Sequence, residues 1–190
     1  MLQEILLIDN YDSFTYNLYH LLYTLTGKPP VVVRNDKVAP EFVNDFQALV
    51  LSPGPGLPSE AGKMIECIKA AWNKIPVLGV CLGHQAIGEL MGAKLKNMQQ
   101  VFHGVSRSAT IVEKDKLYNG IDSPFEAGSY HSWTIDPLFL PEEMIVTAVD
   151  DEGEILSFHH KTLPLTGIQY HPESILTPAG PAIIANWLRG

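Results

Sequence analysis

The chain has little cysteine and no long apolar run, and these two features argue against a secreted disulfide-rich protein and a membrane-spanning protein. Two cysteines occur in 190 residues, so a disulfide-stabilised secreted fold is not expected. No apolar run approaches the ~20 residues that a membrane-spanning helix needs. The N-terminal stretch MLQEILLID also has no basic-then-apolar leader pattern. We therefore expect a cytoplasmic protein with no membrane partner.

Basic residues are also few. There are 13 Lys and Arg against 21 Asp and Glu, which gives a net charge of −8 and a pI near 5.3. A surface of this sign repels phosphate backbones and anionic lipids, so nucleic acid is not an expected partner.

Repeats, low-complexity tracts and linker-like stretches are absent from the sequence. With 46% hydrophobic residues, we expect residues 1–190 to form a single domain with a sizeable core.

The order of apolar patterns predicts an α/β fold. In the first half, buried-type strands alternate with helices, which indicates a mostly parallel sheet covered by helices on both faces. In the second half, strand-like segments follow one another with short turns, which indicates some antiparallel pairing. Functional sites in such folds lie at the carboxyl ends of the strands. The expected strands are residues 4–9, 31–34, 47–52, 76–80, 106–112, 145–150, 154–160 and 165–170.

The first expected helix, residues 13–26, has recognisable start and stop signals. Asp12 or Ser13 is a suitable N-cap, and Gly27 is a suitable stop. Further helices are expected at 40–46, around Cys67, after Cys81 and within 178–190. The apolar stripe of the first helix consists of Phe14, Leu18, Leu21, Leu22 and Leu25.

The two cysteines lie in different contexts. Cys67 belongs to a helical pattern, SEAGKMIECIKAAWNK, on the face that turns to the core, so we interpret it as a core residue. Cys81 lies in the frame G-V-C-L-G, where an apolar strand pattern ends and a helical pattern begins. In the related G-x-S-x-G elbow, a nucleophile occupies a strained strand-to-helix turn at the start of a helix, whose N-terminus favours a thiolate. Cys81 is therefore the candidate nucleophile.

A cysteine nucleophile needs a base, and His171 is the best candidate among seven histidines. It follows the expected strand 165–170, and Pro172 restrains its backbone. Glu173 is near enough to accept the second ring N–H and so orient the imidazole. His84 is the alternative base, although three residues along a helix from Cys81 its side chain is expected to point away. His159 and His160 end a strand without a carboxylate at an informative spacing, His103 and His131 lie in loops, and His20 is structural or on the surface.

The loop SPGPG, residues 52–56, follows the expected strand 47–52. Its prolines stiffen it and its glycines leave backbone N–H groups open. We expect an oxyanion hole in which one donor is the N–H of Leu82, directly after the nucleophile, and the other is the N–H of Gly54.

With these residues assembled, the chain resembles the class I, triad-type glutamine amidotransferases. Within them it is similar to the glutaminase subunit of anthranilate synthase or of aminodeoxychorismate (para-aminobenzoate) synthase. The resemblance runs almost from end to end, and no single stretch would be as specific as the combination. The matching stretches are LLIDNYDSFTYNL, RND, SPGPG, GVCLGHQAIG, HG at 103–104, YHS at 130–132 and HPESILT.

The resemblance implies a flavodoxin-like domain with a triad of Cys81, His171 and Glu173. It implies that Cys81 attacks the side-chain amide of L-glutamine, that ammonia leaves, and that water hydrolyses the resulting thioester. A chorismate-binding synthase subunit would use the ammonia, and Mg²⁺ would be needed only on that partner, with no cofactor in this chain. The glutamine-binding residues it implies are Gly54, Pro55, Gly56, Gln85, Ser132 and Trp133.

Gln85 also suits this role chemically, because it lies one helical turn after Cys81. Two residues depart from the family pattern, Tyr170 for Phe and Trp133 for Leu, and both keep a large apolar body. The departures are expected to affect pocket shape or the partner-facing surface, not the activity. The stretch DNYDSFTYNL also matches the family, but the sequence assigns no catalytic group in it.

Two alternatives compete with this assignment. The first is a stand-alone γ-glutamyl or amide hydrolase of the same fold, which the triad alone would permit. The second is a non-enzymatic flavodoxin-like or receiver-like module, which would leave the elbow and the H-P-E stretch unexplained. No metal site is expected, because the cysteines lack ligand spacing. Whether the product is anthranilate or aminodeoxychorismate depends on the partner.

Overall fold

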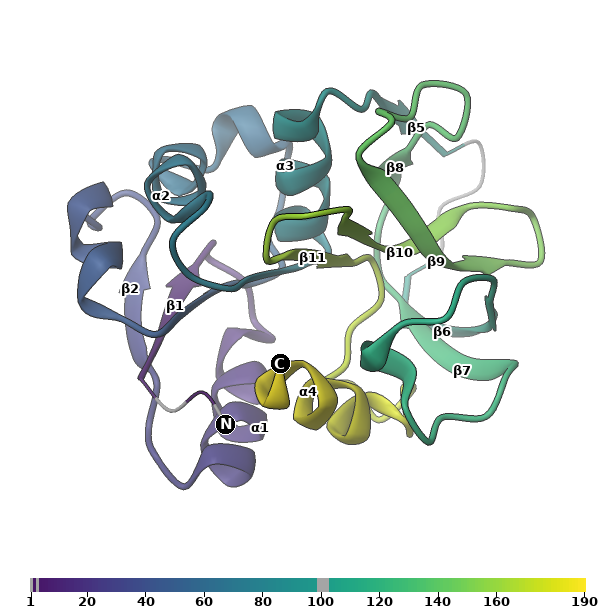
Figure 1. Cartoon of the computed structure of the whole chain (residues 1–190), viewed down its shortest axis with the longest axis horizontal. Coiled ribbons are helices and arrows are strands. Elements are labelled where there is room, and N and C mark those ends of the chain that lie inside the picture. Colours follow the sequence, from purple (N-terminus) through teal and green to yellow (C-terminus); the bar gives the residue numbers. More distant parts are fainter. Residues whose placement is uncertain (1, 3, 99–102) are drawn as a thin grey trace.

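The computed structural model describes residues 2, 4–98 and 103–190. Within these residues, nine strands form one sheet in the order β2-β1-β3-β4-β11-β10-β9-β6-β7, and β5 pairs separately with β8 (Figure 1). The strands are β1 (Ile5–Asp9), β2 (Val31–Arg34), β3 (Ala48–Leu51), β4 (Val77–Val80), β5 (Leu95–Asn97), β6 (Val105–Ile111), β7 (Phe125–Ser129), β8 (Trp133–Ile135), β9 (Met144–Asp150), β10 (Ile155–His160) and β11 (Leu165–Ile168). The helices are α1 (Thr15–Thr26), α2 (Met64–Ala71), α3 (Leu82–Met91) and α4 (Gly180–Arg189), with short 3-10 helices η1 (Pro40–Asp45), η2 (Pro58–Glu60) and η3 (Lys116–Tyr118).

The main sheet has a parallel half and an antiparallel half. The strands β2, β1, β3, β4 and β11 are parallel neighbours. From β11 onward, β10, β9, β6 and β7 pair antiparallel. The pairing changes from parallel to antiparallel where short connections replace helical crossovers, as the change of pattern along the sequence predicted. All five parallel strands therefore end at the same edge of the sheet.

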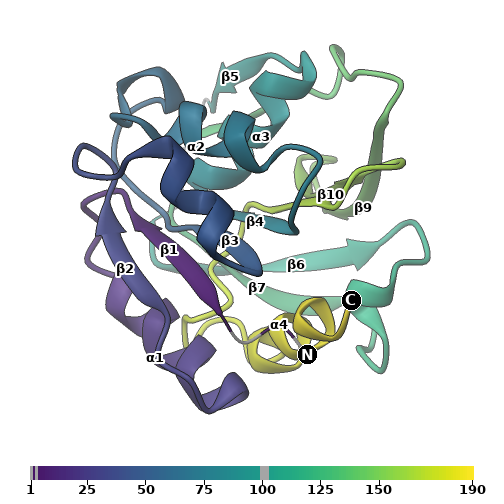
Figure 2. The same ribbon diagram turned by 60° about the vertical axis from the view of Figure 1, so that its left-hand side comes forward.

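Helices cover both faces of the parallel half, and each face has its own core. The strands β1, β3 and β4 are completely buried, and successive side chains along each strand point alternately into one core and the other. On one face, Leu7 and Val50 pack with Leu18 of α1 and Ile184 of α4. On the other face, the core contains side chains of α2 and α3, which lie on the opposite side of the sheet from α1 and α4 (Figure 2).

The start of α1 differs from the prediction. The helix begins at Thr15, its N-cap position is Phe14, and neither Asp12 nor Ser13 caps it. Asp12 Oδ1 instead accepts a hydrogen bond from the N–H of Phe14 at 2.7 Å, which makes a local turn before the helix. Phe14 is consequently not part of the apolar stripe. The predicted stop at Gly27 is confirmed, because Gly27 adopts φ +72° and its N–H donates to the carbonyl of Tyr23.

Strands β5, β7 and β8 were not predicted. β5 and β8 have three residues each, too few for an alternating pattern, and β7 reads FEAGS, with a glycine and a glutamate. Trp133, which lies outside the expected strands, is the first residue of β8. None of the helices in the described part of the chain has the length and apolarity required to span a bilayer.

Candidate active site

The predicted site residues gather at the carboxyl edge of the parallel strands. Cys81 directly follows β4, and His171 follows β11, which is hydrogen-bonded to β4 as its neighbour. The SPGPG loop follows β3, the neighbour of β4 on its other side. Sheet order alone therefore brings the nucleophile, base and oxyanion candidates together.

Cys81 occupies a strained turn between β4 and α3. Its backbone has φ +53° and ψ −101°, a region that residues with a side chain rarely adopt. A methyl group on Gly79 would overlap the carbonyl of Gly83 and lie 2.6 Å from His84 N, and one on Gly83 would lie 2.6 Å from Leu51 Cβ. The two glycines therefore permit the close packing that makes the turn possible. The predicted elbow geometry is confirmed, and the thiol lies at the N-terminus of α3.

His171 is buried and oriented by Glu173. Its Nδ1 lies 2.8 Å from Glu173 Oε1, and the carboxylate has no solvent exposure. The backbone of His171 is fixed as well, since its N–H donates to the carbonyl of Gly128 and its carbonyl accepts from Thr177 Oγ1. The second ring nitrogen, Nε2, is buried and has no hydrogen bond of standard geometry among the described residues. That nitrogen is therefore left for Cys81.

The surroundings of His171 favour its protonated form. Burial by itself lowers the pKa of the ring, but interactions with the side chains of Cys81 and Glu173 outweigh burial and raise the pKa to about 10. At neutral pH the ring can therefore hold a proton between the thiol and the carboxylate. Such a proton suits a group that must later protonate a leaving amine.

Two aromatic rings hold the imidazole from the side. The ring of Phe14 packs edge-on to His171 at 5.3 Å between centroids, and the ring of Tyr130 lies 4.6 Å away. The hydroxyl of Tyr130 is 2.9 Å from Ser174 Oγ, so it is anchored to the segment that carries His171. Phe14, displaced from the α1 stripe, therefore contributes to the site.

The SPGPG loop lies against the elbow, as predicted. A methyl group on Gly54 would lie 2.8 Å from Leu82 Cδ2, so the loop and the residue after Cys81 are in direct contact. Among residues 2, 4–98 and 103–190, no group accepts a backbone hydrogen bond from the N–H of Gly54 or of Leu82. Both N–H groups therefore lack a protein acceptor among these residues, which is consistent with the expected role as oxyanion donors.

Gln85 connects the elbow helix to residue 133. Its Nε2 donates to the carbonyl of Trp133 at 2.8 Å and to Gln169 Oε1 at 3.3 Å. His131 Nδ1 lies 3.0 Å from the same Trp133 carbonyl. The amide nitrogen of Gln85 is thus occupied, and its Oε1 makes no hydrogen bond to a described residue. Ser132 is half-buried beside this group, while Pro55 and Gly56 are exposed on the loop.

The remaining histidines and Cys67 have other environments. His84 is fully buried against the ring of Phe158, and burial lowers its pKa to about 3, so it stays neutral and points away from the site. Cys67 is fully buried, and burial raises its pKa to about 11, as a core residue requires. His159 does have a carboxylate partner that its sequence spacing did not reveal, since its Nε2 lies 3.4 Å from Asp115 Oδ2.

Tyr170, one of the two departures from the family pattern, turns inward. It is only 1% exposed, and its hydroxyl lies 3.0 Å from the hydroxyl of Tyr118. Its extra oxygen is thus satisfied in the core, and Tyr170 does not alter a partner-facing surface.

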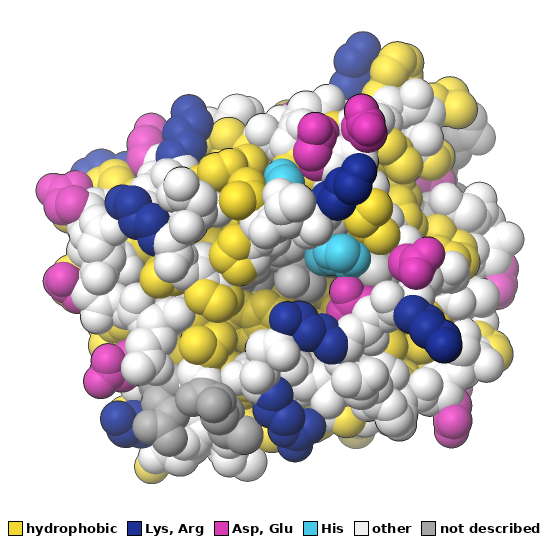
Figure 3. All heavy atoms as spheres, viewed as in Figure 1, with side chains coloured by type: hydrophobic (Ala, Val, Ile, Leu, Met, Phe, Trp, Pro, Cys, Tyr) yellow, Lys and Arg dark blue, Asp and Glu magenta, His cyan; other side chains and the backbone are white. Residues whose placement is uncertain are grey.

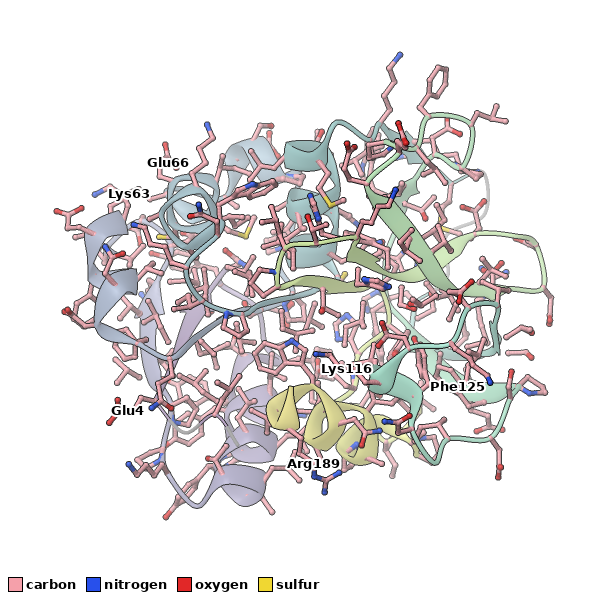
Figure 4. The ribbon with its side chains drawn as sticks, in the orientation of Figure 1. Glu4, Lys63, Glu66, Lys116, Phe125 and Arg189 are labelled. Atoms are coloured by element: carbon pink, nitrogen blue, oxygen red, sulfur yellow. The ribbon has the colours of Figure 1, made fainter. Side chains whose placement is uncertain are left out.

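A separate hollow of about 550 Å³ lies at the opposite edge of the sheet, where β4 and β11 begin. Pro76, Lys116, His159 and Leu165 are among its lining residues. Figure 3 shows this hollow with histidine and basic side chains at its rim, and Figure 4 labels Lys116 beside it. None of the proposed catalytic groups reaches it. In the described part of the chain, no three His, Cys, Asp or Glu residues are placed to hold a metal ion.

Several residues at the site were missed from the sequence. They are Phe14, Tyr130 and Gln169. Phe14 lies in the DNYDSFTYNL stretch and Tyr130 in YHS, so these two belong to quoted motifs. Their roles could not be assigned from the sequence because each side chain contacts a segment that is distant along the chain.

Comparison with known proteins agrees with this geometry. The sequence profile described as "Glutamine amidotransferase class-I" matches residues 6–190. The chain is 42% identical over 187 residues to the Bacillus subtilis "Aminodeoxychorismate/anthranilate synthase component 2", covering 97% of this chain and 95% of that protein. It is 39% identical over 192 residues to the Thermotoga maritima "Bifunctional protein TrpGD", covering 99% of this chain but only 32% of that longer protein.

Solved structures agree as well. A "putative gmp synthase subunit a protein" from Thermoplasma acidophilum superposes with a TM-score of 0.88 at 25% identity, covering all of this chain and 94% of the other. The flavodoxin-like fold prediction is therefore confirmed. A family profile that spans nearly the whole chain, together with relatives near 40% identity, shows that the chain belongs to the class-I glutamine amidotransferase family.

Proposed function

We propose that this chain is the glutaminase subunit of a synthase that makes anthranilate or 4-amino-4-deoxychorismate. Its Cys81, His171 and Glu173 hydrolyse L-glutamine and release ammonia. A chorismate-binding partner subunit then consumes the ammonia. The partner assignment rests on relatives that are themselves named as component 2 of such synthases.

The observation that carries the proposal is the position of His171. Its Nδ1 is bound to Glu173 Oε1 at 2.8 Å, its buried Nε2 has no hydrogen bond to a described residue, and the side chain of Cys81 helps to raise the pKa of the ring. A thiol, an imidazole and a buried carboxylate in this order form a nucleophile, a base and an orienting group.

The reaction follows from this arrangement in two steps. The proton of the Cys81 thiol passes to His171, and the resulting thiolate attacks the side-chain amide carbon of glutamine. The carbonyl oxygen becomes an oxyanion facing the N–H groups of Gly54 and Leu82. His171 gives its proton to the departing nitrogen, which leaves as ammonia, and a γ-glutamyl thioester remains on Cys81. His171 then takes a proton from water, which attacks the thioester and releases glutamate.

Glutamine would be held beside the loop at Gly54, Pro55 and Gly56. The free Oε1 of Gln85 can accept from a donor on the substrate. The family resemblance adds backbone groups of Ser132 and Trp133, of which the Ser132 carbonyl already accepts from the N–H of Met98. Gln85 and His131 both bond the Trp133 carbonyl, so they also fix the backbone that would contact the substrate.

The test is a comparison of two nitrogen sources in the complex with the partner. Cys81→Ser is expected to abolish synthesis from glutamine, while synthesis from added ammonia continues because only the ammonia supply is lost. Wild-type glutamine hydrolysis at the same rate with and without any chorismate-binding subunit would instead favour a stand-alone amide hydrolase. Normal glutamine hydrolysis by Cys81→Ser would contradict the triad.

A further inference from the structure

Asn10 joins the carboxyl ends of three parallel strands. It directly follows β1, while Asn35 follows β2 and Ser52 follows β3. Asn10 Nδ2 donates to the carbonyl of Ser52 at 2.8 Å, and the backbone N–H of Asn10 donates to Ser52 Oγ at 2.9 Å. Asn10 Oδ1 accepts from Asn35 Nδ2 at 3.0 Å. A single side chain therefore ties together the two loops on either side of it.

This hydrogen-bonded group is closed to solvent. Asn10 is 2% exposed, Asn35 is 6% exposed and Ser52 is fully buried. The second proton on Asn10 Nδ2 points to Met64 Sδ at 3.3 Å, so the amide has a partner on every side. Buried polar groups that are all satisfied hold one geometry, because any movement leaves a donor or acceptor without a partner.

Asn10 also contacts the SPGPG loop directly. A methyl group on Gly54 would lie 2.6 Å from Asn10 Cβ and 2.8 Å from both Asn10 O and Leu82 Cδ2. Gly54 is thus wedged between Asn10 and the residue that follows the nucleophile. Asn10 and Leu82 therefore confine Gly54 from two sides.

We propose that Asn10 is a positioning residue for the oxyanion hole, acting through Ser52 and Gly54, and that Asn35 supports it. This inference rests on the proposed function, because it concerns the same glutamine-hydrolysing site. It assigns a role to the DNYD and RND stretches, which contribute no reacting group. Asn10 is not expected to touch glutamine, since its polar atoms are occupied by the protein.

A misplaced oxyanion donor has a distinctive kinetic consequence. Such a donor acts on the charge of the transition state, so its loss lowers kcat and leaves KM nearly unchanged. Alkylation of Cys81 by iodoacetamide forms no oxyanion, because the thiolate displaces iodide from a saturated carbon. The alkylation rate therefore measures the reactivity of the Cys81 sulfur without a contribution from the oxyanion donors.

The experiment uses Asn10→Asp in the complex with the partner subunit. The new carboxylate oxygen faces the Ser52 carbonyl where the amide N–H had been, so the loop is pushed away without a change in side-chain size. A shift of about 1 Å is expected to lower kcat for glutamine by about 10- to 100-fold. KM and the alkylation rate of Cys81, followed by peptide mapping, are expected to change by less than about threefold.

Asn186→Asp is the matched control. Asn186 is also a buried asparagine, it belongs to α4, away from the site, and its Nδ2 donates to the carbonyls of Leu117 at 3.1 Å and Asn119 at 2.8 Å. It is expected to lose comparable thermal stability and to keep its kcat. Asn35→Ala provides a second variant should Asn10→Asp not fold, because it removes only the donor to Asn10 Oδ1 and should lower kcat in the same selective way.

Each outcome bears on the proposal. A selective loss of kcat in Asn10→Asp or Asn35→Ala, absent from Asn186→Asp, supports it. An unchanged kcat in these variants, or a parallel fall of kcat and alkylation rate, overturns it. A wild-type complex that releases no glutamate from glutamine contradicts the proposed function instead, so the two failures are distinguishable.

Discussion

Substitution of Gly79 tests why a glycine lies two residues before the nucleophile. In Gly79→Ala, the new methyl group would overlap the carbonyl carbon and oxygen of Gly83 and lie 2.6 Å from His84 N. These are backbone atoms at the start of α3, so no side-chain rotation can relieve the overlap. The first turn of α3 must move relative to β4.

The size of the effect follows from these contacts. Ordinary van der Waals contact begins near 3.4 Å, so the first turn of α3 must move by about 1 Å. Forcing one methyl group into a close-packed site costs about 1–3 kcal/mol of unfolding free energy. The same movement displaces Cys81 and the N–H of Leu82, and a 1 Å misplacement can cost about 100-fold in rate. We expect Gly79→Ala to lose about 100-fold in kcat before it loses its fold.

Gly88→Ala is the control on the same helix. Its methyl group would lie 2.5 Å from Ile135 Cδ1, the flexible end of a side chain that can turn aside. The assay measures kcat for glutamine with the partner present and the melting temperature of each variant. Gly79→Ala with wild-type kcat, or Gly88→Ala equally inactive while folded, would refute the argument that the elbow requires this glycine.

Three further predictions concern the triad, pH and the partner. His171→Ala is expected to lower kcat by about 10⁴-fold or more and Glu173→Ala by less, because the latter loses orientation but keeps the base; the reverse order in steady-state kinetics would contradict these roles. Burial lowers the pKa of His84 to about 3 and of His131 to about 4. Because the unfolded chain binds these protons near pH 6.5, the unfolding free energy measured in urea should fall as the pH drops from about 6.5 towards 4, and a flat profile would argue against neutral buried rings. The isolated chain should be a poor glutaminase, and the partner with chorismate should raise kcat/KM by about 10- to 100-fold; equal values would exclude such coupling.

The sequence was sufficient to locate the reacting groups because their signals are local. The G-V-C-L-G frame predicted a strained turn at Cys81, and the structure has φ +53° there. Likewise, Glu173 is two residues from His171, so its contact with Nδ1 could be predicted from spacing. Strand alternation then placed both at one edge of a parallel sheet.

The supporting contacts could not be predicted because they join distant segments. Asn10 and Ser52 are 42 residues apart, and Phe14 reaches His171 only because α1 begins two residues later than expected. The local sequence around an asparagine or a phenylalanine looks the same whether or not its side chain contacts a distant residue in the fold. Strand pairs as short as β5 and β8 are likewise fixed by tertiary packing, in this case around α3 and Trp133.

A covalent γ-glutamyl thioester on Cys81 can be trapped directly, by acid quenching of the wild-type complex during turnover of isotopically labelled glutamine, followed by peptide mapping. We expect label on the peptide that contains Cys81, no label in Cys81→Ser, and none on the buried core residue Cys67. Label on Cys67 would contradict the assignment of Cys81 as the nucleophile. So would release of glutamate with no label on Cys81 at any quench time, together with normal turnover by Cys81→Ser.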